Sequence, residues 1–188
     1  PHRRIRLLVC PTDAPNRKVG VLEALAREAR NPVLLVNDAD IRVPPGYLRA
    51  VVAPLTDAAV GLVTCLYRAD SRTLPGRWEA LGIASDFMPS VMLAPWVSVS
   101  EFALGSTLAF RAADLARIGG FAALSAYLAD DYQLGRHLSR LGYRIELSPV
   151  VVETSVGGSW RAVWDHQLRW ARTIRVSRPG GYAGLILT

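Results

Sequence analysis

The chain has 188 residues, of which 51% are hydrophobic and 20% are charged. This length and composition are typical of one globular domain with a substantial core, and they exclude a disordered or low-complexity chain. Lysine and arginine number 22 against 16 acidic residues, a formal net charge of +6, and Lys18 is the only lysine. This arginine-rich balance predicts an anionic partner: a sugar nucleotide, an acidic lipid headgroup or nucleic acid. Cys10 and Cys65 predict free, buried thiols in a reducing compartment.

The first third of the chain predicts alternating strands and helices. Residues 5–10 have the pattern of a short strand, residues 19–30 carry apolar side chains at helical spacing, and residues 33–36 form a continuous apolar run. We expect a β-α-β unit whose two strands are parallel. A helix over 46–55 and a buried strand over 59–66 follow, so the pattern predicts an α/β sandwich.

Polar residues follow the apolar run at 33–36. Asn37, Asp38 and Asp40 stand at its carboxyl end, where open α/β sheets place their ligand crevice. Two carboxylates one residue apart suit Mg²⁺ or Mn²⁺, and such a metal also holds the phosphates of a substrate. The structural alternative is that Asp38 or Asp40 is a turn or N-cap residue.

A second apolar segment predicts a long helix over 74–93. Its apolar side chains recur every three or four residues, and residues 94–97 add further apolar bulk. The stripe is typical of a helix that packs on a core, and the alternative is an interfacial patch that touches a bilayer or a lipid. No stretch reaches the roughly 18 continuous apolar residues of a membrane span.

The next elements carry a glycine interruption and an acidic pair. Residues 101–111 predict a strand that Gly105 and Ser106 interrupt, and a glycine in a strand often marks the approach of a ligand to the backbone. A short helix over 114–118 follows. Asp130 and Asp131 then open a helix that ends near Leu141, where capping of the helix dipole is a sufficient structural reason for two carboxylates. Residues 144–147 and 150–154 are predicted as strands.

The last predicted element is a helix over 159–177. It holds three tryptophans and, counting Arg178 just beyond it, five arginines. Such a helix suits a membrane interface, a phosphate pocket walled by tryptophan, or simply the basic surface of a domain. The composition alone leaves these three interpretations open.

Asp38-x-Asp40, Asp130-Asp131 and Arg169-Trp170 follow one another in a fixed order. With them the chain resembles the processive-type inverting glycosyltransferases of families 2 and 21, which carry the pattern D, D, D, (Q/R)xxRW. It is most similar to the ceramide glucosyltransferase group, including the bacterial hopanoid-associated glycosyltransferases. The matching stretches are Asn16-x-Lys18-Val19 with Leu22, Asn37-Asp38-Ala39-Asp40, Gly105-Ser106, Ala129-Asp130-Asp131-Tyr132 and His166-Gln167-Leu168-Arg169-Trp170.

The resemblance implies one catalytic domain over residues 1–188 with a GT-A-like α/β fold. Its mixed, mainly parallel sheet is flanked by helices and followed by an amphipathic interfacial helix. It also implies a nucleotide-sugar donor, expected to be a UDP-sugar. In this family Asp40 corresponds to the ligand of a divalent metal (Mn²⁺ or Mg²⁺) on the donor diphosphate, and Asp38 helps to hold the donor or the metal.

The resemblance assigns the remaining site residues as follows. Asp131 corresponds to the general base, and Arg169 and Trp170 lie near the donor phosphates and the acceptor. Gly105, Ser106 and Asp130 belong to the loops around donor and acceptor. His166 stands at the first position of (Q/R)xxRW, and we expect it to donate to phosphate or to stack. We also expect Asp130 to raise the pKa of Asp131 because two like charges are adjacent.

One family feature is missing from the sequence. The first aspartate of the pattern belongs to the uridine-binding half of the fold, and residues 1–16 are too short to contain that half. We therefore expect the sequence to be an excerpt that lacks the N-terminal nucleotide-binding part and the flanking membrane helices of its relatives.

The expected activity is sugar transfer to a lipid hydroxyl, such as that of ceramide or a hopanoid. The enzyme would associate with the cytoplasmic face of a membrane, the inner membrane in a bacterium. The first alternative is a family 2 enzyme that builds a polysaccharide. The second is a non-enzymatic basic domain that binds membrane or nucleic acid. Nucleic acid is disfavoured because the arginines concentrate near the end of the chain and no recognition module is present.

Overall fold

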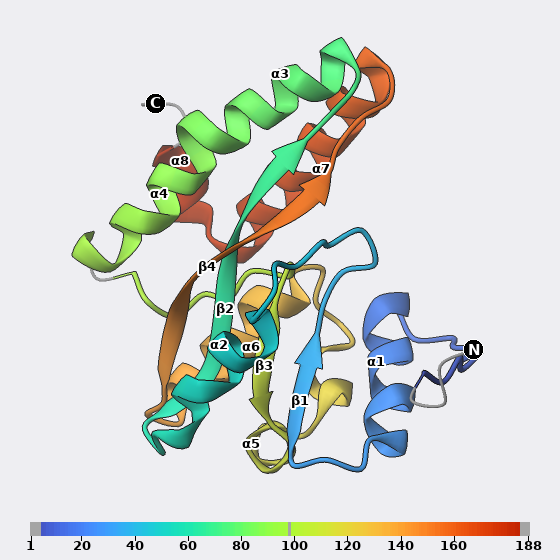
Figure 1. The fold of residues 1–188 in the computed structure, drawn as a ribbon, viewed down its shortest axis with the longest axis vertical. Coiled ribbons are helices and arrows are strands. Elements are labelled where there is room, and N and C mark those ends of the chain that lie inside the picture. Colours follow the sequence, from blue (N-terminus) through green and yellow to red (C-terminus); the bar gives the residue numbers. More distant parts are fainter. Residues whose placement is uncertain (1–4, 98, 185–188) are drawn as a thin grey trace.

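The computed structural model describes residues 5–97 and 99–184 (Figure 1). These residues form a sheet with the strand order β1-β3-β2-β4, made by β1 (Val33–Val36), β3 (Leu108–Arg111), β2 (Val60–Asp70) and β4 (Arg144–Ser155). The predicted mixed sheet flanked by helices is confirmed. Its pairing is less parallel than expected, because β3 is antiparallel to both β1 and β2 and only β2 and β4 are parallel.

The predicted strand over residues 5–10 is wrong, and so is its parallel pairing with β1. These residues have no regular structure, and Ile5, Leu7 and Val9 are exposed. A short apolar run forms a strand only where a neighbour completes its backbone hydrogen bonds. In this part of the chain, the side chain of Arg6 instead forms an ion pair with Glu28 on the first helix.

The helices on the N-terminal side agree with the predictions. Helix α1 spans Arg17–Glu28 and begins at Asn16, whose side chain accepts a hydrogen bond from the amide of Val19. Helix α2 (Tyr47–Val52) continues into the 3₁₀ turn η1 (Ala53–Thr56). Gly46 adopts a positive φ of 80° in front of α2, a conformation that favours glycine.

The long apolar segment is one continuous helical run. It comprises α3 (Leu74–Gly82), the π-helical turn η2 (Ile83–Phe87), α4 (Met88–Leu93) and the 3₁₀ turn η3 (Ala94–Val97). The expectation that its apolar stripe lies in the core is wrong for most of its length. The run is long and apolar enough to cross a membrane by length and composition, but only 11% of its most apolar window is buried.

The C-terminal half also departs from the predictions in its details. Only Leu108–Arg111 of the predicted strand over 101–111 pairs in the sheet, whereas the two strands predicted over 144–154 are one strand, β4. Helix α5 (Ala112–Arg117), the 3₁₀ turn η4 (Phe121–Leu124) and α6 (Asp130–Arg140) lie between them. Helix α7 (Trp160–Ser177) confirms the last predicted helix, and the short α8 (Pro179–Gly184) follows.

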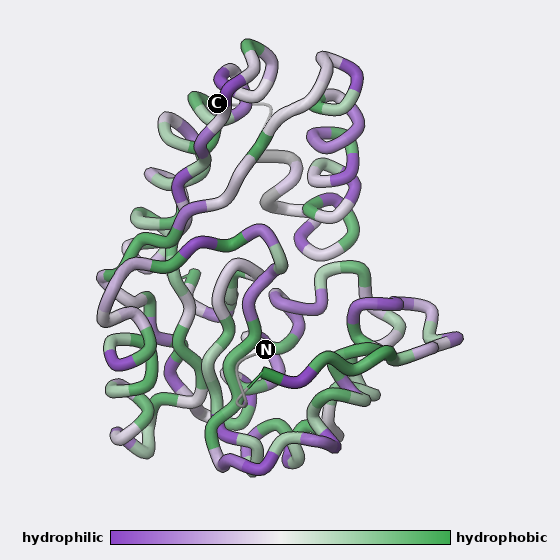
Figure 2. The backbone as a smooth tube through the Cα atoms, turned by 45° about the vertical axis from the view of Figure 1, so that its right-hand side comes forward, coloured by the Kyte–Doolittle hydropathy of each residue, from purple (hydrophilic) through white to green (hydrophobic). Residues whose placement is uncertain are grey.

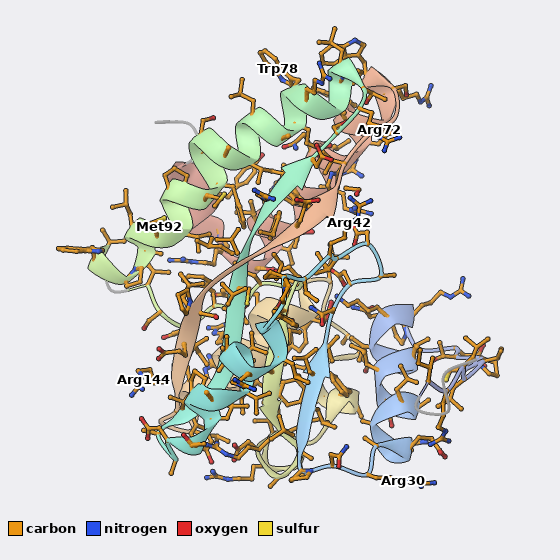
Figure 3. The ribbon with its side chains drawn as sticks, in the orientation of Figure 1. Arg30, Arg42, Arg72, Trp78, Met92 and Arg144 are labelled. Atoms are coloured by element: carbon orange, nitrogen blue, oxygen red, sulfur yellow. The ribbon has the colours of Figure 1, made fainter. Side chains whose placement is uncertain are left out.

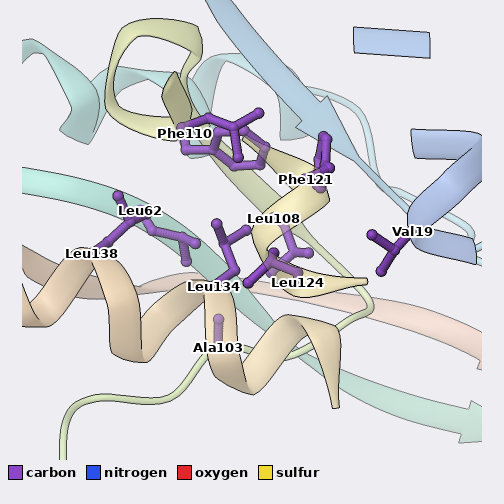
Figure 4. Packing of buried hydrophobic residues seen from close by; sticks show 10 residues of the cluster. Val19, Leu62, Ala103, Leu108, Phe110, Phe121, Leu124, Leu134 and Leu138 are labelled. Carbon is purple, nitrogen blue, oxygen red and sulfur yellow. The ribbon is translucent and has the colours of Figure 1, made fainter. Parts of the chain in front are cut away.

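The sheet has a hydrophobic cluster on each face. Leu62 and Phe110 point to the side covered by α1, η4 and α6, whereas Val63 and Ala109 point to the side covered by α2. Figure 4 shows the first cluster, in which Leu134 and Leu138 of α6 pack near Leu62. In Figure 2 the hydrophobic stretches run along the central strands, and the helices alternate in colour. Cys65 is buried in the second cluster and Cys10 is half-buried, both as free thiols.

Strands β2 and β4 are much longer than their neighbours. They have 11 and 12 residues, whereas β1 and β3 have four each. Beyond the ends of the short strands they continue as a two-stranded ribbon, accompanied by α3 and α7 (Figure 1). The polar residues that follow β1 therefore lie where the sheet narrows.

Candidate functional site

A pocket of about 560 Å³ lies at the carboxyl end of β1. It is lined by residues of β2, α3, η2, α6 and α7 together with the loops before β3 and after β4. Nearly all candidates from the sequence stand in its wall, namely Asp38, Asp40, Gly105, Ser106, Asp131, His166, Arg169 and Trp170. Asp130 does not line the pocket: it is buried behind it, and its carboxylate pairs with Lys18.

Asp131 stands at the start of α6 with its carboxylate in the pocket wall. The amide of Tyr132 donates to its Oδ1 over 2.7 Å. Burial among protein atoms and then the neighbouring charge of Asp130 raise the pKa of Asp131 to about 6, against the opposing effects of Tyr132, Lys18 and the amide of Gly105. The expected influence of Asp130 is present, but desolvation is the larger cause. A carboxylate with this pKa is suited to accept a proton near neutral pH.

Lys18 is the cation at the centre of the acidic residues. Its Nζ lies 2.9 Å from Oδ1 of Asp38 and 3.6 Å from Oδ2 of Asp130. Burial alone would lower the pKa of Lys18, but the charges of Asp130, Asp38 and Asp131 together raise it. The sequence pattern singled out Lys18 without giving it a role, because its partners come from two distant segments.

Asp40 differs from Asp38 in its surroundings. It is exposed, and its Oδ2 accepts a hydrogen bond of 2.6 Å from the hydroxyl of Thr154. No group of three or more His, Cys, Asp or Glu side chains arranged to hold a metal occurs in residues 5–97 and 99–184. Magnesium sites at phosphates, however, use only one or two protein carboxylates, with substrate oxygens and water as the other ligands. Asp40 fits this arrangement better than Asp38, whose carboxylate is paired with Lys18.

The turn at Gly105 brings the backbone against the carboxylates. A Cβ at position 105 would lie 3.0 Å from Oδ2 of Asp131 and 3.4 Å from Oδ2 of Asp38, so glycine permits this close approach. Ser106 has a structural hydroxyl, which is buried and donates to the carbonyl of Cys65 over 3.0 Å. The side-chain amide of Asn37 donates to the backbone carbonyl of Ser106 over 2.7 Å and thereby connects the end of β1 to this turn.

Helix α7 presents different tryptophans to the pocket and to the surface. Ser159 caps its first turn, and its pocket face carries Ala162, His166, Arg169, Trp170 and Ile174. These positions recur every three or four residues, so they share one helix face. Trp160 and Trp164 are exposed. The helix is therefore both a pocket wall and an exposed aromatic surface.

Glu79 is a pocket residue that the sequence interpretation missed. Its side chain is only 2% exposed. Its Oε1 lies 2.5 Å from Nδ1 of His166, within hydrogen-bond distance, and accepts a hydrogen bond from Nε2 of Gln167 over 3.1 Å. The available signal was a carboxylate inside the apolar pattern of residues 74–93, which also contain Asp86. Such a residue is buried only when it has partners.

Aromatic rings complete the wall between β2, η2 and α7. The ring centroids of Tyr67 and Phe87 are 5.0 Å apart, those of Phe87 and Trp170 5.6 Å, and those of His166 and Trp170 5.1 Å. Burial and the nearby carboxylates of Asp131, Glu79 and Asp38 raise the pKa of Tyr67 above its ordinary value. The pocket thus joins an acidic and basic end to an aromatic wall.

Comparison with known proteins relates the chain to glycosyltransferases. The model of glycosyl transferase family 21 matches residues 1–188. A mannosyltransferase from Pyrobaculum calidifontis, solved in complex with GDP-Man and Mn²⁺, has 26% sequence identity and a TM-score of 0.63 over 81% of this chain. Glucosyl-3-phosphoglycerate synthase from Mycobacterium tuberculosis, solved with Mn²⁺ and UDP-glucose, has 18% identity and a TM-score of 0.47 over 91% of this chain.

The matched regions are only part of these two proteins. The chain spans 40% of the length of the first and 56% of the second. The likeness to the archaeal structure confirms a GT-A-like α/β fold over most of the chain.

Proposed function

Because the chain belongs to glycosyl transferase family 21, we propose that its pocket is the catalytic site of a metal-dependent inverting glycosyltransferase. The enzyme transfers a sugar from a nucleotide-sugar donor, a UDP-sugar, to the hydroxyl of a lipid such as ceramide or a hopanoid. The observation that carries this proposal is that Asp40, Asp131 and Arg169, from three distant segments, line one pocket of about 560 Å³.

The donor diphosphate is assigned to the end of the pocket between Asp40 and Arg169. Arg169 supplies positive charge and paired N–H donors for phosphate oxygens. Asp40, with Asp38 beside it, holds the divalent cation, which neutralises the charge of the diphosphate when it is bound. Lys18 compensates the charges of Asp38 and Asp130, so Asp40 is the main ligand of the metal and Asp38 is the weaker one.

Asp131 is proposed as the general base. In the transfer, the acceptor oxygen forms a bond to the anomeric carbon, and the bond from that carbon to the phosphate oxygen breaks on the opposite side. The proton of the acceptor hydroxyl passes to Asp131, and the diphosphate leaves with the bonding electrons. A pKa of about 6 keeps Asp131 mostly ionised at pH 7 while leaving it basic enough to take this proton.

A lipid acceptor is supported by the outer face of the helical run. We define the apolar platform as its large exposed hydrophobic residues: Leu74, Trp78, Leu81, Met92, Leu93, Trp96 and Val97. Figure 3 shows Trp78 and Met92 on the outer side of this run. The inner side of the same run lines the pocket with Glu79, Ile83 and Phe87.

The arrangement favours a run that lies in the membrane interface over one that crosses the bilayer. Its inner side packs on β2 and α7 through buried residues, including the carboxylate of Glu79. Exposed tryptophans beside polar groups are typical of interfacial helices. Association with the cytoplasmic face of a membrane, with the pocket close to the lipid headgroups, follows from this proposal.

Product analysis of the full-length gene product tests the proposal. The enzyme is incubated with UDP-glucose or GDP-mannose, Mn²⁺ and vesicles that contain a lipid extract, and glycosylated lipids are identified by mass spectrometry. We expect a sugar-modified lipid that disappears with a chelator. In Asp131→Asn the product should also disappear while UDP binding is retained. The matched control is Asp165→Asn, which alters an exposed carboxylate of α7 outside the pocket.

Two results would contradict parts of this proposal. Sugar incorporated only into a soluble polymer would support the polysaccharide-building alternative. Absence of nucleotide release from every donor would refute the transferase itself. Co-sedimentation of the protein with vesicles, measured without any nucleotide-sugar donor, separates a membrane-binding role from catalysis.

A further inference from the structure

Glu79 and His166 form a buried link between the helix of the apolar platform and the helix that carries Arg169. Glu79 belongs to α3 and His166 to α7, 87 residues apart in the sequence. Both line the pocket. No residue of the D, D, D, (Q/R)xxRW pattern corresponds to Glu79.

The hydrogen bonds to Glu79 fix the orientation of the histidine ring. Both donors, from His166 and Gln167, meet the same oxygen, Oε1. An ionised carboxylate only accepts hydrogen bonds, so beside an ionised Glu79 the Nδ1 that faces it carries a proton, whether or not Nε2 carries a second one. The other ring nitrogen, Nε2, is then on the side of the ring away from α3.

The ring is held on its other side as well. It meets Trp170 in an edge-to-face arrangement at 5.1 Å, and Trp170 packs in turn on Phe87 of the π-helical turn. His166 and Arg169 are three residues apart and both line the pocket, so they share one face of α7. A π-helical turn inside an α-helix is frequently found at a functional site.

We propose that Glu79 is a positioning residue of the transferase pocket, which holds His166 with Nε2 directed at the departing diphosphate beside Arg169. This inference rests on the proposed transferase function and adds a residue to it. With Nδ1–H donated to Glu79, a second proton on Nε2 lets this nitrogen donate to a phosphate oxygen while the bond to the sugar breaks. The acceptor proton still passes to Asp131, so His166 gains and loses no proton in the step.

A purely structural role for Glu79 is the competing interpretation. Buried ion pairs are weak evidence for stability, because desolvation of the two charges offsets much of their attraction. An apolar pair would connect two helices equally well. The placement of this pair in the pocket wall, beside Trp170, is what favours a role in orientation.

A double-mutant cycle tests the proposal with the full-length enzyme, by nucleotide release from UDP-glucose or GDP-mannose. Glu79→Gln keeps an oxygen that accepts from His166 and Gln167 but removes the charge. His166→Asn keeps a donor that can face Glu79 but removes Nε2. We expect each variant to lower kcat roughly 10- to 100-fold, as for the loss of one charge-assisted hydrogen bond, with little change in the KM for the donor. The double variant should lose no more than either single variant.

Asp114→Asn is the matched control. Asp114 is a buried carboxylate with its own partners, Arg111 and Tyr143, and it lies outside the pocket. Asp114→Asn should lower the midpoint temperature of unfolding, and it should leave kcat unchanged at a temperature where the protein stays folded. Glu79→Gln should show the opposite pattern.

A spectroscopic measurement on the unmodified protein keeps the test independent of variant folding. Histidine-selective ¹⁵N NMR, with His166 assigned by its absence in His166→Asn, should show a protonated Nδ1. The inference about Glu79 would be overturned by an unaltered kcat in Glu79→Gln, by losses that multiply in the double variant, or by an unprotonated Nδ1. None of these results would contradict the proposed transferase function. A parent enzyme that releases no nucleotide from any donor overturns the proposed function, and this inference with it.

Discussion

The ammonium nitrogen of Lys18 lies 2.9 Å from Oδ1 of Asp38 and so joins the first helix to the end of β1. The same side chain reaches Asp130 at 3.6 Å, which places one cation between two pocket carboxylates, Asp38 and Asp131, and the buried Asp130. Removing the charge of Lys18 should raise the pKa of Asp131 further, because Lys18 is one of the groups that lower it.

The pH dependence of activity provides the first prediction. The proposed base must be ionised, so kcat/KM should rise with pH through about 6, the pKa of Asp131. In Lys18→Met the rise should move to higher pH, because a cation that favours the ionised form is lost. Arg27→Met is the control, since Arg27 is on the same helix but exposed and paired with Glu23. Equal profiles for all three proteins would argue against Asp131 as the base.

The stability of Asp131→Asn should differ from that of the parent in a pH-dependent way. The pKa of Asp131 is raised from 3.8 to about 6 in the folded protein, so the native state binds this proton more tightly than the unfolded chain. The ionised carboxylate therefore costs stability progressively as the pH rises from about 4 to above 6. We expect Asp131→Asn to stabilise the fold by about 1–3 kcal/mol at pH 7.5 and to have no such effect at pH 3.5.

Denaturant unfolding at the two pH values measures this difference. The comparison within one variant serves as the internal control, because lost hydrogen bonds such as that from Tyr132 would lower stability at both. A stabilisation that is equal at the two pH values would mean that the carboxylate is not desolvated. The stability that Asp131→Asn is predicted to gain equals what the parent protein loses by holding an ionised functional group in an unfavourable environment.

The acidic motifs could be predicted from the sequence because each is local. Asp38 and Asp40 follow a four-residue apolar run, and Asp131 and Arg169 follow them in the order of the D, D, D, (Q/R)xxRW pattern. The predicted pairing of residues 5–10 with β1 is wrong, because an apolar run does not identify a partner strand. Likewise, the antiparallel pairing of β1 with β3 joins Val33 to Arg111 across the chain. Glu79 was missed since its meaning depends on His166, a contact that exists only after α3 packs on α7.

Gly105 offers a steric prediction. An added Cβ would lie 3.0 Å from Oδ2 of Asp131, so Gly105→Ala must displace either the turn or the carboxylate. We expect kcat to fall on the order of 10- to 100-fold, as for a misplaced reacting group. Gly82→Ala is the matched control, because a Cβ there meets nothing within 4 Å and the residue is helical. It should leave activity unchanged and stabilise the fold by about 0.5–1 kcal/mol.

The apolar platform leads to a prediction about membrane binding. Trp78 and Trp96 are 65% and 86% exposed at two separate points of the helical run, so both can enter a bilayer interface without disturbing the core. Trp78→Ser and Trp96→Ser should each weaken co-sedimentation with vesicles about tenfold, in line with the loss of one large buried apolar group. Leu48→Ser is the control, since Leu48 is 63% exposed on α2, away from the platform.

The same variants separate binding from chemistry. The pocket is lined by the opposite side of the run, so hydrolysis of the nucleotide-sugar donor in detergent-free solution should be unchanged in Trp96→Ser. Transfer to a lipid in vesicles should fall with the binding. If Leu48→Ser weakens sedimentation as much as Trp96→Ser, the attraction is not specific to the platform. A loss of donor hydrolysis in Trp96→Ser would mean instead that the outer face of the run shapes the pocket, because its two faces would then be coupled through η2.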